Sequence, residues 1–220
     1  MWYPIRMIVQ QAFVGALGVD TDTKLNATSA AALAAQGLKF AIRYLSLGEA
    51  ESLGDLTQDE TQAVLSAGLA LMPVQHVRVP GWLPSASQGT ADGSVAAAHA
   101  VAAGIPAGVT VWMDLEGVSS AAPTDVVIAY ANNWNTSVRA AGYDTGLYVG
   151  AACGLDGATL FTKLNVSRYW KSQSDVPQVQ RRGYCMYQLL PSETIAGVAC
   201  DYNVVQEDFL GGLPRWVCAT

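Results

Sequence analysis

Five times along this chain, a short apolar run rich in Val, Ile and aromatic residues is followed by a stretch typical of a helix. The predicted strands cover residues 15–20, 39–45, 69–76, 109–116 and 146–150. The predicted helices cover residues 29–36, 57–68, 91–103, 124–141 and 156–164. Strands that alternate with helices form a parallel sheet with the helices packed outside it. The alternation therefore predicts an α/β fold.

The alternation stops after residue 164, and three more apolar runs follow, over residues 168–173, 184–190 and 195–203. Too little sequence separates the last two runs for a packed crossover helix. Eight strands predict closure into a barrel. The expected fold is a modified TIM-type barrel, with five β/α units followed by three strands that have few or no helices between them. No linker or charge block divides the chain, so residues 1–220 are expected to form a single domain.

A doubly wound open sheet is the structural alternative to the barrel. Its nucleotide-binding version has a glycine-rich phosphate fingerprint after the first strand, and this chain has none there. The barrel is therefore favoured.

The second predicted helix has clear signals at both ends. Thr57 is expected to cap its start, and Glu60, three residues later, would complete a capping box. Gly68 is expected to end it.

Composition limits the classes of partner. Half of the residues are hydrophobic (51%) and 14% are charged, which indicates a packed interior rather than disorder. No apolar run reaches the roughly 18 residues that a membrane-spanning helix needs. The net charge is −6 and the basic residues are scattered, so neither nucleic acid nor an anionic membrane is an expected partner.

The first twenty residues, MWYPIRMIVQQAFVGALGVD, do not read as an ordinary secretory signal. Pro4 and Arg6 precede only a short apolar patch, which Gln10 and Gln11 interrupt. If the protein acts outside the cytoplasm, another route is expected to deliver it.

The four cysteines are far apart and form no CxxC pair, which argues against a zinc site. Buried free thiols are expected. A bridge between Cys185 and Cys200 is the alternative, because both lie on late segments that could be neighbours.

Four acidic residues lie where predicted strands end, which is where barrels of this kind place their active sites. They are Asp20 after the first strand, Asp114 and Glu116 on the fourth, and Asp201 on the last. Side chains alternate between the two faces of a strand, so Asp114 and Glu116 point the same way. The same parity allows Asp20 and Asp201 to face the barrel mouth with them.

Two carboxylates on one face of an apolar strand repel each other in a low-dielectric site, and one pKa is driven up. That penalty makes a purely structural role a poor explanation for the Asp114–Glu116 pair. A raised pKa is what a general acid needs near neutrality, and paired carboxylates are the usual means of cleaving a glycosidic bond. Clustered acids could instead bind Mg²⁺ or Ca²⁺. No DxDxDG-type loop is present, so neither a metal nor another cofactor is predicted.

Aromatic residues near the predicted mouth are candidates to stack on sugar rings. Trp112 shares the face of Asp114 and is expected to belong to the core. Trp82 lies in a loop rich in Pro, Gly and Ser and is the better candidate for an exposed platform. Tyr148 and Trp170 are further candidates.

Two basic side chains are also expected near the mouth. His76 ends the third strand and is expected to be a hydrogen-bonded lining residue, because no GxSxG nucleophile elbow supports a Ser/His/Asp triad. Arg43, on the second strand, is assigned the lumen parity of Ala41 and Leu45. It is expected to pair with a carboxylate of the mouth.

Several segments, in order along the chain, resemble the glycoside-hydrolase-like domains known as domain of unknown function 1906, which are related to the family 25 lysozymes. The segments are GVDTDT, LKFAIRYL, AGLALMPVQ, VTVWMDLEG, GLYVG, YQ and ACDYN. The resemblance runs from about Gly18 to Asn203, and the DxE of the fourth strand is its most specific part. The late run of strands without helices matches the modified barrel of that family.

The resemblance implies roles for individual residues. Glu116 would be the general acid, and Asp114 would stabilise charge or hold the N-acetyl group of the substrate. Asp20 and Asp201 would complete the acidic mouth, and it would be lined by Gln188 and Tyr148. The implied substrate is peptidoglycan, cut between N-acetylmuramic acid and N-acetylglucosamine. Arg43 and Tyr44 depart from the pattern of the lysozymes.

Three hypotheses follow. The first is a glycoside hydrolase of the lysozyme type that acts on the bacterial cell wall, outside the cytoplasm, after delivery by a phage or a secretion machine. The second is a catalytically inactive barrel that binds carbohydrate, and the third is a metal-dependent hydrolase such as a phosphodiesterase. The sequence does not indicate an oligomeric state.

Overall fold

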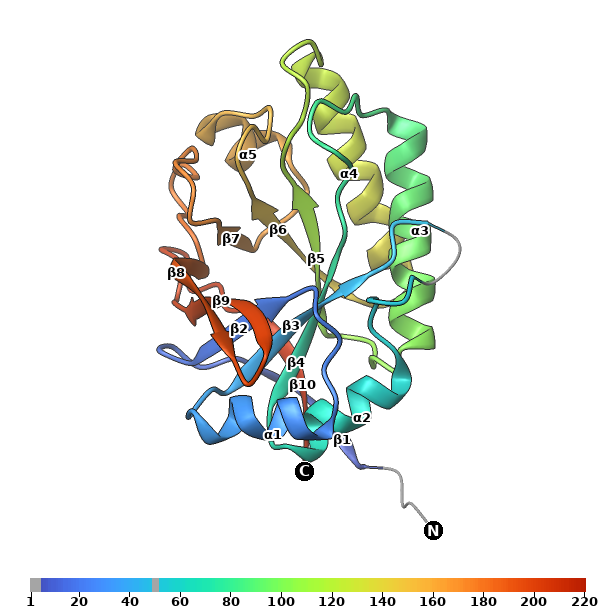
Figure 1. The fold of residues 1–220 in the computed structure, drawn as a ribbon. Coiled ribbons are helices and arrows are strands. Elements are labelled where there is room, and N and C mark those ends of the chain that lie inside the picture. Colours follow the sequence, from blue (N-terminus) through green and yellow to red (C-terminus); the bar gives the residue numbers. More distant parts are fainter. Residues whose placement is uncertain (1–4, 49–51) are drawn as a thin grey trace.

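The computed structural model describes residues 5–48 and 52–220, in which eight strands close into a barrel. Around the ring the strands follow the order β4, β3, β2, β9, β8, β7, β6 and β5, and β5 pairs with β4 again. Figure 1 shows the strands at the centre and helices packed outside them. The modified TIM-type barrel that the sequence predicts is confirmed.

The first part of the ring consists of five β/α units. Their strands are β2 (Leu17–Thr21), β3 (Phe40–Leu45), β4 (Ala70–Gln75), β5 (Thr110–Leu115) and β6 (Asp144–Val149). Their helices are α1 (Ala27–Ala35), α2 (Gln58–Ser66), α3 (Ala86–Ala102), α4 (Thr124–Ala140) and α5 (Gly157–Lys163). These ranges agree with the predicted ones to within a few residues. The exception is α3, which begins five residues earlier because Ser85 accepts a hydrogen bond from the amide of Gln88 and caps it.

Three strands complete the ring: β7 (Tyr169–Lys171), β8 (Met186–Ile195) and β9 (Val198–Val205). No helix separates them in the described chain. β8 and β9 form an antiparallel hairpin, and its turn residues Ala196 and Gly197 both have a positive φ, as a two-residue hairpin turn requires. β9 is therefore antiparallel to β2 as well, so the sheet is mixed rather than parallel throughout.

Two strands near the ends of the chain lie outside the closed ring. β1 (Met7–Gln11) and β10 (Arg215–Ala219) pair with each other in antiparallel fashion, and β10 also pairs with β4. Trp216 of β10 is buried against the ring of Phe40. Neither strand is predicted from the sequence.

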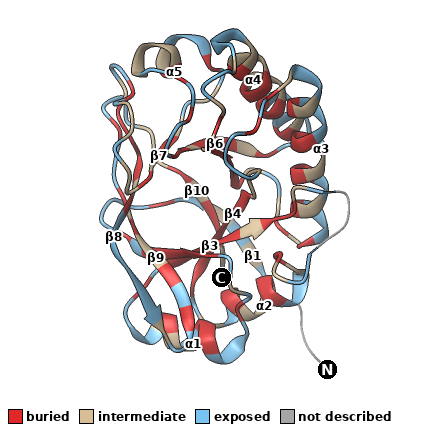
Figure 2. Cartoon of the chain, turned by 45° about the horizontal axis from the view of Figure 1, so that its top comes forward, coloured by how far each residue is buried: buried red, intermediate tan, exposed pale blue. Residues whose placement is uncertain are grey.

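Large aromatic side chains fill the interior of the barrel below its mouth. Trp112 and Trp170 are fully buried and meet edge to face, with ring centroids 5.8 Å apart. Gly146 leaves room for the Trp112 ring, because a Cβ at that position would collide with it. Figure 2 shows the inner surfaces of the helices and most of the ring strands as buried. These aromatic side chains fill the described part of the barrel interior below the mouth.

All four cysteines are free thiols, and the alternative of a Cys185–Cys200 bridge is wrong. Cys153, Cys185 and Cys200 are buried, as expected, and Cys218 is partly exposed. Within residues 5–48 and 52–220, no helix is both long enough and apolar enough to cross a membrane.

Candidate active site

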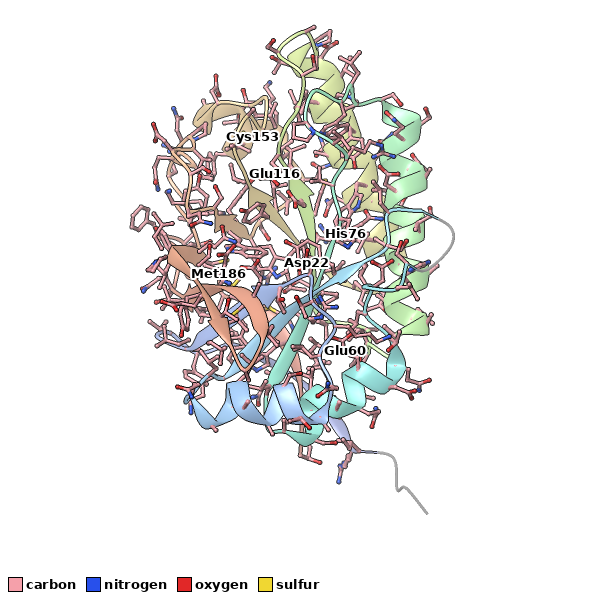
Figure 3. The ribbon with its side chains drawn as sticks, in the orientation of Figure 1. Asp22, Glu60, His76, Glu116, Cys153 and Met186 are labelled. Carbon is pink, nitrogen blue, oxygen red and sulfur yellow. The ribbon has the colours of Figure 1, made fainter. Side chains whose placement is uncertain are left out.

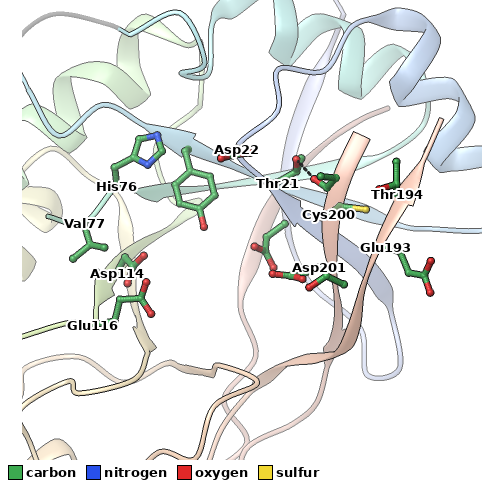
Figure 4. Close-up of a pocket in the computed structure, with 14 residues that line it drawn as sticks. Thr21, Asp22, His76, Val77, Asp114, Glu116, Glu193, Thr194, Cys200 and Asp201 are labelled. Carbon is green, nitrogen blue, oxygen red and sulfur yellow. Dashed lines mark hydrogen bonds between the residues drawn. The ribbon is translucent and has the colours of Figure 1, made fainter. Parts of the chain in front are cut away.

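An open cleft with a volume of about 520 Å³ lies at the carboxyl ends of β2 to β5 and along the β8–β9 hairpin. All four acidic residues that the sequence places at the mouth, Asp20, Asp114, Glu116 and Asp201, line this cleft. Figure 4 shows Asp114 and Glu116 on one side and Asp201 across from them. The structure thus brings together side chains from three strands that are far apart in the sequence.

Asp20 and Asp201 lie directly opposite each other on β2 and β9. Asp20 is 4% exposed. Its Oδ2 atom accepts hydrogen bonds from Asn203 Nδ2 at 2.6 Å and from Gln188 Nε2 at 3.0 Å. Gln188 Nε2 also donates to Asp201 Oδ2 at 3.2 Å, so this amide links the two carboxylates.

Donor-only groups fix the orientation of both amides. The indole N–H of Trp170 donates to Asn203 Oδ1 at 2.8 Å, so the NH2 group of Asn203 must face Asp20. The backbone N–H of Gln173, which can only donate, donates to Gln188 Oε1 at 3.3 Å, and the Tyr148 hydroxyl donates to the same oxygen at 2.9 Å. Asp20 is therefore held by a hydrogen-bond network that continues into the barrel core.

Burial raises the pKa of Asp20 from its ordinary 3.8 to about 7. The hydrogen bonds from Asn203 and Gln188 oppose this rise, and the charge of Asp201 adds to it. The Asp20 carboxyl can therefore gain or lose a proton close to neutral pH.

On the β5 side of the cleft, Asp114 is 7% exposed, and its Oδ1 atom has no hydrogen-bond partner among the described residues. Burial raises its pKa well above the ordinary value, and the charges of Glu116 and Asp20 raise it further. Glu116 is half-buried, and burial raises its pKa too. A carboxyl that retains its proton near neutrality can act as a general acid.

The residue that follows β6 leaves space for Glu116. A Cβ at Gly150 would lie 2.5 Å from Glu116 Oε2, which is closer than real Cβ atoms come. The indole of Trp82 donates to the backbone carbonyl of Glu116 at 2.8 Å and holds the chain at this point.

Tyr44 and His76 form another wall of the cleft, and their rings stack with centroids 4.5 Å apart. His76 lines the cleft, and its Nε2 atom lies 3.2 Å from Oδ1 of the buried Asp55, within ion-pairing distance. Burial lowers the pKa of His76, and Asp55 partly offsets this effect. Burial and the nearby charges of Asp20 and Asp114 raise the pKa of Tyr44 above its ordinary value.

The prediction that Arg43 pairs with a carboxylate of the mouth is wrong. Tyr44, not Arg43, faces the cleft, so the predicted parity of β3 is off by one residue. The Arg43 side chain is fully buried on the opposite face, and its Nε atom lies 2.6 Å from Glu60 Oε1 on α2. Its other nitrogens donate to the carbonyls of Thr21 and Gly54. Figure 3 shows Glu60 at α2, well away from Glu116.

The predicted capping box at α2 is only half present. Thr57 accepts a hydrogen bond from the amide of Glu60. The Glu60 carboxylate binds Arg43 and the amide of Leu25 instead of the start of its own helix. The ion pair on the helix side of β3 therefore takes the place of the second capping bond.

The prediction that Trp82 is an exposed platform is wrong, because Trp82 is 8% exposed. Its indole packs against the ring of Tyr130 at 5.0 Å, and Arg78 lies over it. Trp170 is buried as well and offers no face to a sugar. Trp112 belongs to the core, as expected. Tyr148 is half-buried and stays a candidate, because it contacts Gln188 at the edge of the acidic network.

Part of the cleft wall is not predicted from the sequence. Tyr44 and Asp22 were not singled out, and neither was the β8 segment 192–194. The alternation along β3 could have indicated Tyr44, since a strand residue next to an outward Arg faces inward. In the part of the chain that the structure describes, no group of three or more His, Cys, Asp or Glu side chains could hold a metal ion.

Comparison with known proteins gives a family and a fold. Residues 31–197 match the family model for the Rv2525c-like, glycoside hydrolase-like domain. No curated protein matches the chain in a sequence search.

Several solved structures share the fold at low sequence identity. The Tat-secreted protein Rv2525c of Mycobacterium tuberculosis, in complex with L-tartrate, superimposes with a TM-score of 0.65 and 18% identity, over 88% of this chain and 96% of that one. The catalytic domain of the endolysin ply40 from bacteriophage P40 of Listeria monocytogenes has a TM-score of 0.60 and 13% identity, over 89% and 95%. The modular autolysin LytC of Streptococcus pneumoniae, in complex with a synthetic peptidoglycan ligand, has a TM-score of 0.57 and 12% identity, over 87% of this chain and 47% of that one.

Proposed function

This chain belongs to the Rv2525c-like, glycoside hydrolase-like domain family, and we propose from that membership and from its acidic cleft that it is a glycoside hydrolase that cleaves bacterial cell-wall peptidoglycan. One observation carries the proposal. Asp114 and Glu116 extend from one face of β5 into an open cleft, opposite Asp20 and Asp201. The fold likeness to a phage endolysin domain and to an autolysin supports a glycan as the substrate.

In the proposed mechanism, Glu116 is the general acid. Burial raises its pKa above the ordinary value, and the half-buried side chain reaches the cleft, where its protonated form can protonate the leaving glycosidic oxygen. Hydrolysis is then expected to fall as the pH rises through the pKa of Glu116, because the acid loses its proton.

Asp114 is assigned a supporting role beside the reacting carbon. Its unpartnered Oδ1 atom is available to accept a hydrogen bond from the N-acetyl group of the substrate. Once ionised, it would also stabilise positive charge that develops on the sugar ring. Asp20 and Asp201, held by Gln188, form the opposite side of the site, and the Tyr148 hydroxyl holds the Gln188 amide in place.

The proposed place of action is the cell wall, outside the cytoplasm. Rv2525c is described as Tat-secreted, and the ply40 domain comes from a phage endolysin. Both are fold relatives whose names place them in secretion or lysis. For this chain, delivery by a phage or a secretion machine stays part of the proposal.

The test is a turbidity assay on purified bacterial cell walls with the wild type and Glu116→Gln. The substitution is expected to lower the rate of clearing by about 10² to 10⁴-fold, which is the usual contribution of a general acid. Glu207→Gln is the matched control, because Glu207 is exposed and lies outside the cleft. Thermal unfolding of all three proteins checks that the substitutions leave the fold intact.

Clearing that survives Glu116→Gln contradicts the role of Glu116. Wild-type protein that binds cell-wall glycan but clears no wall preparation favours a carbohydrate-binding barrel without turnover. Clearing that EDTA abolishes points to a metal-dependent hydrolase instead.

A further inference from the structure

Among the described residues, the cleft is lined by acidic side chains and by no Lys or Arg side chain. Six carboxylate side chains line it: Asp20, Asp22, Asp114, Glu116, Glu193 and Asp201. No Lys or Arg is among the lining residues, and no salt bridge among the described residues reaches any of the six acids. The exposed acids Asp22 and Glu193 give this cleft negative charge that no lining Lys or Arg offsets, which disfavours an anionic ligand and favours a cationic one.

Two of these acids lie outside the group to which the proposed cleavage assigns a role. Asp22 follows β2, and Glu193 lies on β8 in the hairpin that forms one wall of the cleft. Both are exposed. In Figure 4 the acids extend along the cleft, from Asp114 and Glu116 at one end through Asp201 to Glu193 at the other. The negative charge thus reaches beyond the reacting bond, where neighbouring sugar units would bind.

A second observation indicates that the cleft binds a ligand with hydrogen-bond donors. Asp114 is more than nine-tenths buried and lines the cleft, and its Oδ1 atom has no hydrogen-bond partner among the described residues. Leaving such an acceptor unpaired is unfavourable. The described residues also contain no group suited to a metal ion, so an organic cation fits the negative charge better.

We propose that the cleft selects glycans with free amino groups, in which some glucosamine units have lost their N-acetyl group, and that Asp22 and Glu193 bind the ammonium groups of units next to the cleaved bond. The proposed role of this selection rests on the proposed glycosidase function. The selection itself can be measured without turnover, because the experiment measures binding. An ammonium group pairs with carboxylates and donates hydrogen bonds in a way that a neutral N-acetyl group cannot.

The expected preference is moderate, because exposed ion pairs are individually weak. Each ammonium–carboxylate pair at a partly exposed position contributes up to about five-fold in affinity. Two such pairs are therefore expected to give roughly a ten-fold preference at low salt. Added salt screens exposed charges, so the preference should shrink as the ionic strength rises.

The experiment measures binding to two oligomers with the same backbone, the hexamer of N-acetylglucosamine and the hexamer of glucosamine. Every protein in the experiment carries Glu116→Gln so that no ligand is hydrolysed. Affinities are measured by isothermal titration calorimetry at pH 6 in 50 mM and 500 mM NaCl. The glucosamine hexamer is expected to bind about ten-fold tighter than the acetylated hexamer at 50 mM and to lose most of this advantage at 500 mM.

In a protein that also carries Asp22→Asn and Glu193→Gln, the preference for the glucosamine hexamer over the acetylated hexamer is expected to fall to less than about two-fold. The control carries Asp125→Asn and Glu207→Gln, which remove the same charge from exposed positions outside the cleft and should leave the preference unchanged. Thermal unfolding verifies the fold of each variant.

Equal binding of the two hexamers, or binding of neither, overturns the proposal. A preference that persists in the Asp22/Glu193 variant overturns the assignment to these two residues. A wild type that clears no cell wall but shows the preference refutes only the proposed hydrolase function, so the two failures can be told apart.

Discussion

Replacing Asp20 by Asn is expected to stabilise the folded protein above pH 7 and to remove much of the dependence of its stability on pH. Asp20 is buried between β2 and β9, and burial raises its pKa to about 7. An Asn side chain has the same shape and no charge. Its Oδ1 atom can still accept the hydrogen bonds that Asn203 and Gln188 donate to Asp20.

The size of the effect follows from the two pKa values. In the unfolded chain the carboxyl has its ordinary pKa of 3.8, so above pH 7 it is ionised in both the folded and the unfolded state. The folded state is then destabilised, because it holds the charged carboxylate in a buried position. Each pKa unit corresponds to about 1.4 kcal/mol, so a rise from 3.8 to about 7 destabilises the folded state by about 4 kcal/mol. As the pH falls from 7 toward 3.8, the folded protein takes up the proton first and the penalty disappears. Below pH 3.8 the carboxyl is neutral in both states and contributes nothing.

The assay is urea denaturation of the wild type and Asp20→Asn at pH 8, 6 and 4, followed by the fluorescence of the six tryptophans. At pH 8 the variant is expected to be more stable by about 4 kcal/mol, and at pH 4 the two proteins should be nearly equal. Glu207→Gln, at an exposed position outside the cleft and outside the helices, is the control and should change stability by less than about 0.5 kcal/mol. A variant that is less stable than the wild type at pH 8, or a difference that is the same at all three pH values, would refute the reasoning.

Three further predictions concern the groups around the site. Arg43→Met is expected to lower the free energy of unfolding by about 3–5 kcal/mol in urea denaturation, because Glu60 is left buried without its partner; a loss under 1 kcal/mol would contradict a buried ion pair. Gly150→Ala is expected to slow cell-wall clearing by about 10²-fold with little change in melting temperature, because the new Cβ displaces Glu116; unchanged clearing would show that Glu116 tolerates the shift. Cys185 is buried, and burial raises the pKa of its thiol to about 12. It is therefore expected not to react with a thiol reagent at pH 8 until the protein is denatured. Labelling of Cys185 in the native protein, detected by mass spectrometry, would contradict the burial.

The sequence predicted those parts of the fold that depend on local patterns. The alternation of apolar runs and helices gave the five β/α units, and the short spacing between the last two runs gave the strands without helices. The spacing of two between Asp114 and Glu116 placed both on one face, because β5 is a regular strand. These features depend only on residues close together along the chain.

The predictions for Arg43 and Trp82 were wrong because the position of each side chain depends on partners that are distant in the sequence. Arg43 turns away from the mouth because Glu60, on α2, meets it on the outer face of the strand. Trp82 is buried because Tyr130 of α4 packs against it and the carbonyl of Glu116 accepts its N–H. Nothing in the residues beside Arg43 or Trp82 indicates these partners.

The hydrogen-bond network around Asp20 was out of reach for the same reason. Its members Asn203, Gln188 and Trp170 come from β9, β8 and β7, and only the closed barrel places them beside β2. The resemblance implied that Gln188 lines the mouth, but Gln188 is not among the residues that line the cleft, and its amide instead donates hydrogen bonds to Asp20 and Asp201.

The pairing of β1 with β10 gives the chain a further property. The amide of Thr220 donates to the carbonyl of Arg6 at 3.0 Å, so residues from the two ends of the described chain lie side by side. A short linker could join them and turn the backbone into a closed loop without breaking a pair of the ring. New ends could then be opened in the exposed turn at Ala196 and Gly197, which would make a circular permutant whose free ends lie at the tip of the hairpin beside the cleft.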